Sequence, residues 1–139
     1  MAALFHLRVL ASDVSFFDGL CRSVTVPCVD GELGILAHHS NLIAAVVPGE
    51  LRFQPEEGAP RTAAVSSGLL KIEGGEMLLL VDTAERPEDI DANRARRAAD
   101  AAREAILQKR SIQEYRSAQA DLARAVSRLR AKEHWRGPR

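Results

Sequence analysis

The chain has 139 residues, a mass of 15.2 kDa and 46% hydrophobic residues, which fits one compact domain or two small pieces and excludes most multidomain enzymes. Its 19 basic and 19 acidic residues cancel, so the basic excess that a general nucleic-acid binder needs is missing. Apolar runs end at Gly, Pro or charged residues well short of the ~20 residues that cross a bilayer. We therefore expect no nucleic-acid partner and no membrane span, and Met1 to Arg8 show no export or organelle signal.

The zero net charge conceals two segments of opposite character. Residues 1–83 carry 5 basic and 10 acidic residues, and residues 84–139 carry 14 basic and 9 acidic, so their net charges are −5 and +5. Eight of the nine Gly lie in the first segment, whereas residues 88–136 contain neither Gly nor Pro, as helix interiors require. We expect a β-sandwich over residues 1–86 and a helical hairpin over residues 87–139.

Short stretches of alternating polarity follow one another through the first segment. The first of them places Phe5, Leu7 and Val9 on one face, as expected of a half-buried strand. Turn dipeptides such as Asp30-Gly31 and Gly74-Gly75 separate the stretches. The strand candidates are Leu4–Leu10, Arg22–Cys28, Leu42–Val47, Leu51–Gln54, Thr62–Ser66, Leu69–Glu73 and Met77–Asp82. This pattern predicts an all-β, antiparallel, Gly-rich sandwich.

The second segment predicts two helices of about 20 residues with a polar break at Lys109–Gln113. Pro87 suits a first helical turn, and the acids that follow it complement the positive end of the helix dipole. A heptad-like seam is expected between the helices, formed by Ile112, Tyr115, Gln119, Leu122, Val126 and Leu129 against Ala95, Ala98, Ala102 and Ala105. Because alanine contributes little apolar area, this antiparallel hairpin should be marginally stable and able to exchange between folded and extended forms.

Three motifs in chain order make the sequence recognisable. Gly31–Leu51 reads GELGILAHHSNLIAAVVPGEL, Ser66–Leu70 reads SSGLL, and Ala84–Ala95 reads AERPEDIDANRA. The chain resembles the epsilon subunit of bacterial F-type ATP synthases, which carries a Gly-Glu-Leu-Gly-Ile stretch before a His-containing loop and a Pro-Gly turn. The resemblance extends over the whole chain and agrees with the expected β-then-αα order.

This resemblance implies a non-catalytic subunit of the central rotary stalk. Such a subunit binds the gamma subunit and touches the c-ring with its sandwich, at the cytoplasmic face of the bacterial inner membrane. Its hairpin can extend toward acidic segments of the beta subunits, and toward the alpha subunits, and restrain ATP hydrolysis. The +5 charge of residues 84–139 suits such a contact. Whether the parent enzyme moves protons or sodium ions is decided by other subunits.

The His-containing loop departs from the family pattern. This chain has Ala37-His38-His39-Ser40-Asn41 where the family places prolines around its histidine, so only His39 keeps its family position. The resemblance implies that Glu32 and His39 lie on a loop surface that faces the c-ring or gamma. Both could instead be merely solvated loop residues.

The resemblance also implies a regulatory nucleotide site. In nucleotide-sensing members of the family, an Ile-Asp-x-x-Arg-Ala junction, a preceding acid and two second-helix arginines hold ATP in the folded hairpin. The matching residues here are Glu85, Ile90, Asp91, Arg94, Ala95, Arg124 and Arg128. A first-helix arginine of that site falls on Ala101, so the missing cation should weaken the site. Alternatively, Asp91 with Arg94, and Arg124 with Arg128, are ordinary surface charges of a helix.

Two other functions remain open at this point. The set of arginines would also allow a free-standing nucleotide-sensing module. His38, His39 and Glu32 would allow a small metal- or His-dependent enzyme, although adjacent residues of an extended chain point to opposite faces and converge poorly on one ion. We expect no catalytic residue, no metal and no required cofactor, because the sequence has no phosphate-binding Gly-rich loop, nucleophile elbow or Cys-x-x-Cys motif.

Overall fold

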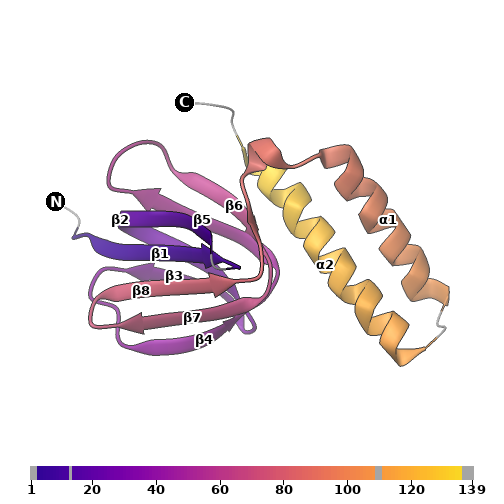
Figure 1. The fold of residues 1–139 in the computed structure, drawn as a ribbon, viewed down its shortest axis with the longest axis horizontal. Helices are drawn as coiled ribbons and strands as arrows, with labels where there is room; N and C mark the ends of the chain where they lie inside the picture. The colour runs from indigo at the N-terminus through magenta and orange to yellow at the C-terminus, as the bar shows by residue number, and fades with distance from the viewer. Residues whose placement is uncertain (1–2, 13, 109–110, 136–139) are drawn as a thin grey trace.

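A computed structural model describes residues 3–12, 14–108 and 111–135 of the chain. In this part of the chain, a β-sandwich precedes a short 3-10 turn and two antiparallel helices (Figure 1). The strands are β1 (Phe5–Ala11), β2 (Val14–Cys28), β3 (Gly31–Leu36), β4 (Leu42–Val46), β5 (Gly49–Pro55), β6 (Arg61–Val65), β7 (Gly68–Glu73), β8 (Glu76–Val81) and β9 (Ala84–Glu85). The helical elements are η1 (Pro87–Asp89), α1 (Ala92–Gln108) and α2 (Ile112–His134). The expected fold class is confirmed.

The long strand β2 belongs to both layers of the sandwich. Its first half pairs with β1, and its second half pairs with β3 and β5. One layer continues through β1, β8, β7 and β4, and the other through β5, β6 and β9. The pairing of β1 with β8 is parallel, so the expectation of a wholly antiparallel sandwich is wrong at this position. Sequence periodicity reports which residues share a face, and it carries no information on the direction of a neighbouring strand.

Large apolar side chains fill the space between the layers. Leu7, Leu51, Leu70, Met77 and Leu79 are almost completely buried, and the alternating burial along β1, β7 and β8 follows the expected pattern. β7 begins at Gly68, where an added Cβ would lie 1.8 Å from the carbonyl oxygen of Leu80. The glycine of the SSGLL motif therefore permits the close approach of β7 and β8.

The two helices form a hairpin in which only α2 lies against the sandwich. α2 packs on β5 and β6 along one side and on α1 along the other, so α1 is the outer helix (Figure 1). The side chain of Ser111 caps α2 by accepting a hydrogen bond from the backbone N–H of Glu114 at 3.1 Å. α2 thus begins within the expected polar break, of which Lys109 lies outside the described residues. No helix in the described ranges is long and apolar enough to cross a membrane.

The expected heptad seam is wrong in part. Ala95 and Ala102 are buried as expected, but Ala98, Ala105, Ile112 and Tyr115 are exposed, and Leu122, Val126 and Leu129 are only half-buried. The buried residues of α2 are Ala118, Ala125, Ser127 and Ala131. The physical reason is that α2 has two neighbours, α1 and the sandwich, whereas a heptad pattern assumes a single contact stripe. The larger side chains of α2 border these contacts rather than fill them.

Candidate functional site

The last turns of α2 are joined to the sandwich and to η1 by a row of polar contacts. The Ser127 hydroxyl donates to the Gly49 carbonyl at 2.6 Å, and the Lys132 ammonium donates to the Pro87 carbonyl at 2.9 Å. Further along the helix, His134 contacts Glu50. Each contact joins positions far apart in the sequence, so sequence periodicity could not identify them.

The carboxylate of Glu50 is the centre of the largest charged cluster at this junction. Its side chain is 5% exposed, and it accepts hydrogen bonds from Arg52 at 3.2 Å and from Nδ1 of His134 at 2.7 Å. Arg52 also donates to Glu32 at 2.8 Å. Burial alone lowers the pKa of Arg52, but its hydrogen bonds to the two acids outweigh burial and raise that pKa. The cluster connects β3, through β5, to the end of α2.

A groove of about 510 Å³ lies between the two helices and contains two of the predicted nucleotide-binding arginines. Arg124 and Arg128 line it together with Ala101, the position at which the family resemblance implied a further arginine. Arg128 donates from Nε to Glu85 at 2.7 Å, and Arg124 pairs with Asp121 one turn earlier on α2. Both cations are therefore already neutralised by acids of the same chain.

The other predicted nucleotide-binding residues lie at the start of α1. Asp91 accepts a hydrogen bond from the backbone N–H of Arg94 at 3.1 Å, which caps the helix, and the side chain of Arg94 is exposed. Ile90 is buried in a small cluster with Ala64 and Ala131, and Ala95 is buried beside α2. The structure thus brings Arg124 and Arg128 to one groove and pairs Arg128 with Glu85, and it gives Asp91 and the two apolar residues local structural roles. The nucleotide site itself stays a prediction.

The residues predicted to face a partner lie near opposite ends of strand β3. Glu32 is in strand β3, not in a loop as expected, because Gly31–Leu36 pairs with the second half of β2. His39 follows in the turn after β3, where its Nδ1 lies 2.8 Å from the carbonyl of Ser40. His38 has a φ of 66°. In the described residues, no three His, Cys, Asp or Glu side chains gather where they could hold a metal ion.

The sandwich also exposes an apolar surface that the sequence analysis missed. We define the outer apolar face by Leu10, Ile43, Ala45, Leu69 and Leu80. Four of these residues pair side by side in one row across β4, β7, β8 and β1. Ile43, Leu69 and Leu80 are 70%, 52% and 42% exposed. The sequence contained a signal for this face, because β4 and β8 carry apolar residues at consecutive positions. In a strand with one solvated face, apolar and polar residues alternate.

Comparison with known families assigns both parts of the chain. Residues 4–87 match the family model of the ATP synthase Delta/Epsilon chain, beta-sandwich domain, and residues 88–133 match the model of its long alpha-helix domain. The chain belongs to the ATP synthase delta/epsilon chain family. The resemblance drawn from the three sequence motifs is therefore confirmed.

Related proteins of this family match along nearly the full length. The chain is 36% identical to ATP synthase epsilon chain 1 of Methylococcus capsulatus over 136 residues, which cover 98% of this chain and 97% of that one. It is 42% identical to the ATP synthase epsilon chain of Ruminiclostridium cellulolyticum over 129 residues, 93% of this chain and 96% of that one.

Two solved structures share the fold. A chain of the mitochondrial ATP synthase of Euglena gracilis, in its OSCP/F1/c-ring part, superposes with a TM-score of 0.84 at 22% identity, covering 95% of this chain and 82% of that chain. A chain of the central stalk and c-ring of the Tetrahymena thermophila enzyme superposes with a TM-score of 0.64 at 11% identity, covering 91% and 95%. At these identities the superpositions support the delta/epsilon fold alone.

Proposed function

We propose that this chain works at the foot of the central stalk of an F-type ATP synthase, where it couples gamma to the c-ring and restrains ATP hydrolysis through its hairpin. In this proposal it is non-catalytic and peripheral to the cytoplasmic face of a bacterial inner membrane. The membership of the delta/epsilon family and the full-length match to epsilon chains support this assignment. The two solved structures with this fold are described as parts of an F1/c-ring assembly and of a central stalk with its c-ring.

The main support for the proposal is that one surface of the sandwich is covered by the same chain and another, apolar surface is not. One surface, over β5 and β6, is covered by α2 of the same chain. The outer apolar face is uncovered, and solvation of contiguous leucine and isoleucine side chains is unfavourable, so this face suits a permanent partner. We assign gamma to the outer apolar face and the c-ring to the end of the sandwich that carries Glu32, whereas His39 lies near the other end of β3.

The hairpin has the properties of a detachable regulator. It is joined to the sandwich by a few polar contacts of α2 and by small apolar contacts, of which Ile90, Ala64 and Ala131 form one cluster. Residues 84–139 carry the +5 charge. After release from the sandwich, these cations would be free to approach acidic segments of the beta and alpha subunits.

Deletion of all residues after Asp89 tests the regulatory role. The truncated chain keeps every strand, so the complex should assemble, ATP synthesis should persist, and ATP hydrolysis should rise relative to the complex with the full chain. A truncated complex with unchanged hydrolysis at several ATP concentrations contradicts a regulatory hairpin. Failure of the full chain to bind gamma of the same species in a pull-down contradicts the stalk assignment itself.

A regulatory ATP site in the groove between the helices is a second candidate function. The arginines 124 and 128 favour it, because their forked N–H groups match phosphate oxygens. Their pairing with Asp121 and Glu85, and the alanine at position 101, oppose it. Calorimetry of the full chain with ATP, repeated with Arg124→Ala and Arg128→Ala, tests this site. No heat up to millimolar ATP excludes it and also excludes a free-standing nucleotide sensor.

A further inference from the structure

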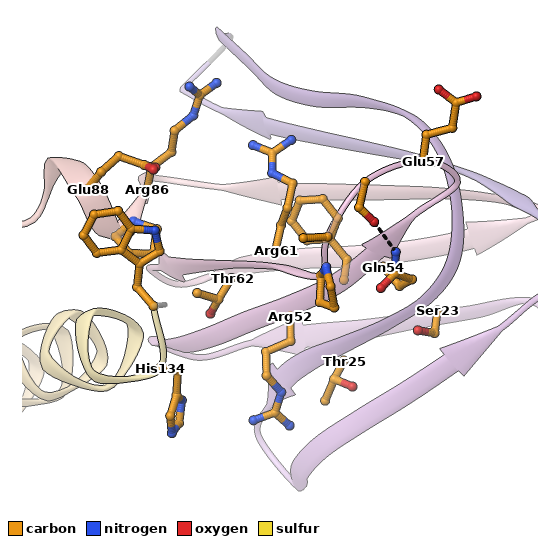
Figure 2. A pocket seen from close by; sticks show the side chains of 16 residues that line it. Ser23, Thr25, Arg52, Gln54, Glu57, Arg61, Thr62, Arg86, Glu88 and His134 are labelled. Atoms are coloured by element: carbon orange, nitrogen blue, oxygen red, sulfur yellow. Dashed lines mark hydrogen bonds between the residues drawn. The ribbon is translucent and has the colours of Figure 1, made fainter. Parts of the chain in front are cut away.

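One cavity of this structure has no role in the functions proposed above. It has a volume of about 680 Å³ and lies where β2, β5, β6, η1 and the end of α2 meet (Figure 2). The β5–β6 loop forms one wall, and His134 and Trp135 at the end of α2 form another. The cavity is separate from the groove between the helices, because the two share no lining residue.

Arg61 is a half-buried cation that lines this cavity and, within the described residues, forms no ion pair. Its guanidinium lies 5.4 Å from the ring centroid of Phe17 and 5.3 Å from that of Phe53. Stacking on two rings holds the group in place but satisfies none of its N–H donors. In the described residues, no carboxylate forms an ion pair with it and no acceptor hydrogen-bonds to it. The guanidinium of Arg61 is thus held in place by the rings while its N–H groups lack hydrogen-bond acceptors among the residues that the structure describes.

Arg86 supplies a second cation on the same side of the cavity. Figure 2 shows the side chains of Arg61 and Arg86 extending in the same direction. Burial lowers the pKa of Arg61, and the positive charge of Arg86 lowers it further, whereas Glu88 only partly compensates. Arg86 also lies 5.9 Å from the ring centroid of Phe16 and forms no ion pair in the described part of the chain. Two like charges held near one another by aromatic rings favour an anion between them.

We propose that this cavity is a binding site for a small phosphate-bearing anion, held between Arg61 and Arg86. Two guanidinium forks offer more N–H donors than one carboxylate can accept, whereas the oxygens of a phosphate or pyrophosphate group match them in number and charge. The cavity volume leaves room for more than one phosphate group. Glu57 and Glu88 also line the cavity, and the negative charge of Glu88 beside Arg61 limits the affinity.

The site is complete only when the hairpin is folded. The end of α2 supplies His134 and Trp135 to the cavity, and Lys132 lies 4.8 Å above the ring of Trp135. An anion that contacts this wall would favour the folded hairpin over the extended one. This regulatory consequence rests on the function proposed above, whereas anion binding by the isolated chain does not.

Calorimetric titration of the full-length chain with pyrophosphate, at constant ionic strength, tests the site. One molecule should bind per chain, and Arg61→Gln and Arg86→Gln should each weaken binding by about tenfold or more, the value of a charge-assisted hydrogen bond. Glu88→Gln should tighten binding, because it removes the opposing charge. Arg97→Gln, on the exposed surface of α1, is the matched control and should bind as the unmodified chain does.

Three results would overturn the proposal. The first is that the folded chain shows no saturable binding of pyrophosphate. The second is that Arg97→Gln loses as much affinity for pyrophosphate as the cavity variants do. The third is that Arg124→Gln or Arg128→Gln loses affinity while Arg86→Gln does not, which would place the anion between the helices. Because Arg86 is exposed, its variant remains informative if Arg61→Gln fails to fold. Parallel titrations with inorganic phosphate and with ATP distinguish a free anion from the phosphate groups of a nucleotide. Loss of gamma binding, by contrast, would leave these results unchanged.

Discussion

The sandwich and the hairpin differ in what they bury. The fully buried side chains of the sandwich include Leu7, Leu51, Leu70, Met77 and Leu79, whereas the buried side chains of the two helices α1 and α2 are alanines and one serine. A buried leucine contributes about 1.5–3 kcal/mol and a buried methyl group about 0.8 kcal/mol, against a chain entropy cost of about 1–2 kcal/mol for each ordered residue. The sandwich therefore has a surplus of stability from its own core, and the hairpin depends on the contacts of α2 with its neighbours.

The largest effect is expected from a cavity in the sandwich core. Leu79→Ala should lower the free energy of unfolding by about 3 kcal/mol, because Leu79 is completely buried between the layers. Urea denaturation followed by circular dichroism measures this change. Ala125→Gly in α2 is the counterpart in the hairpin and should lower the stability of the sandwich by far less. Equal losses in the two variants would contradict the independence of the two regions.

The next effect concerns the outer apolar face. Leu69→Asn combined with Leu80→Asn should weaken gamma binding by about tenfold or more, equivalent to about 1.4 kcal/mol, and leave the midpoint of thermal unfolding nearly unchanged. Surface plasmon resonance against gamma measures the affinity. Leu107→Asn, at an exposed leucine of α1, is the control and should bind gamma normally. Unimpaired binding by the double variant would place gamma elsewhere.

A smaller effect is expected at the polar junction between α2 and the sandwich. His134→Ala removes the hydrogen bond to buried Glu50 and should weaken docking of the hairpin by about 1 kcal/mol. The chain contains a single tryptophan, Trp135, so its fluorescence reports on the end of α2. Emission should move to longer wavelength in His134→Ala and stay unchanged in Gln113→Ala at the other end of the helix. Identical spectra would assign no docking role to His134.

The smallest effect is a pH dependence within the sandwich. A hydrogen bond to Asp18 raises the pKa of His6, burial opposes it, and the charges of Asp18 and Glu76 add to the rise. Since the pKa is raised in the folded state, the stabilisation is complete below about pH 6.5 and is lost as the pH rises through the folded value. Because the partners are exposed, the change should be only about 0.3 kcal/mol. Unfolding free energies at pH 5.5 and 8, compared with those of His6→Gln, measure it.

The sequence predicted the order of the elements because Gly and Pro are almost confined to the first segment. It did not predict β3 as a strand, because Gly31 and Gly34 weaken the strand pattern of Gly31–Leu36, although this segment pairs with the adjacent end of β2 in a tight hairpin. In the candidate site, the groove arginines could be anticipated from the resemblance. The pairing of Arg128 with Glu85, the burial of Glu50 and the cavity around Arg61 arise from contacts between residues remote in the sequence, which no local pattern encodes.

The long strand β2 has a mechanical consequence. Because its 15 residues run from one layer to the other, a shearing force on the layer that carries the outer apolar face passes along the covalent backbone of β2 to its second half, which is hydrogen-bonded to β5. Side-chain packing alone would let the layers slip past one another under load. The hairpin lies outside this load path, on the far side of β5 and β6 (Figure 1). Detachment of the hairpin, as proposed above, would therefore leave the hydrogen-bonded sandwich stiff.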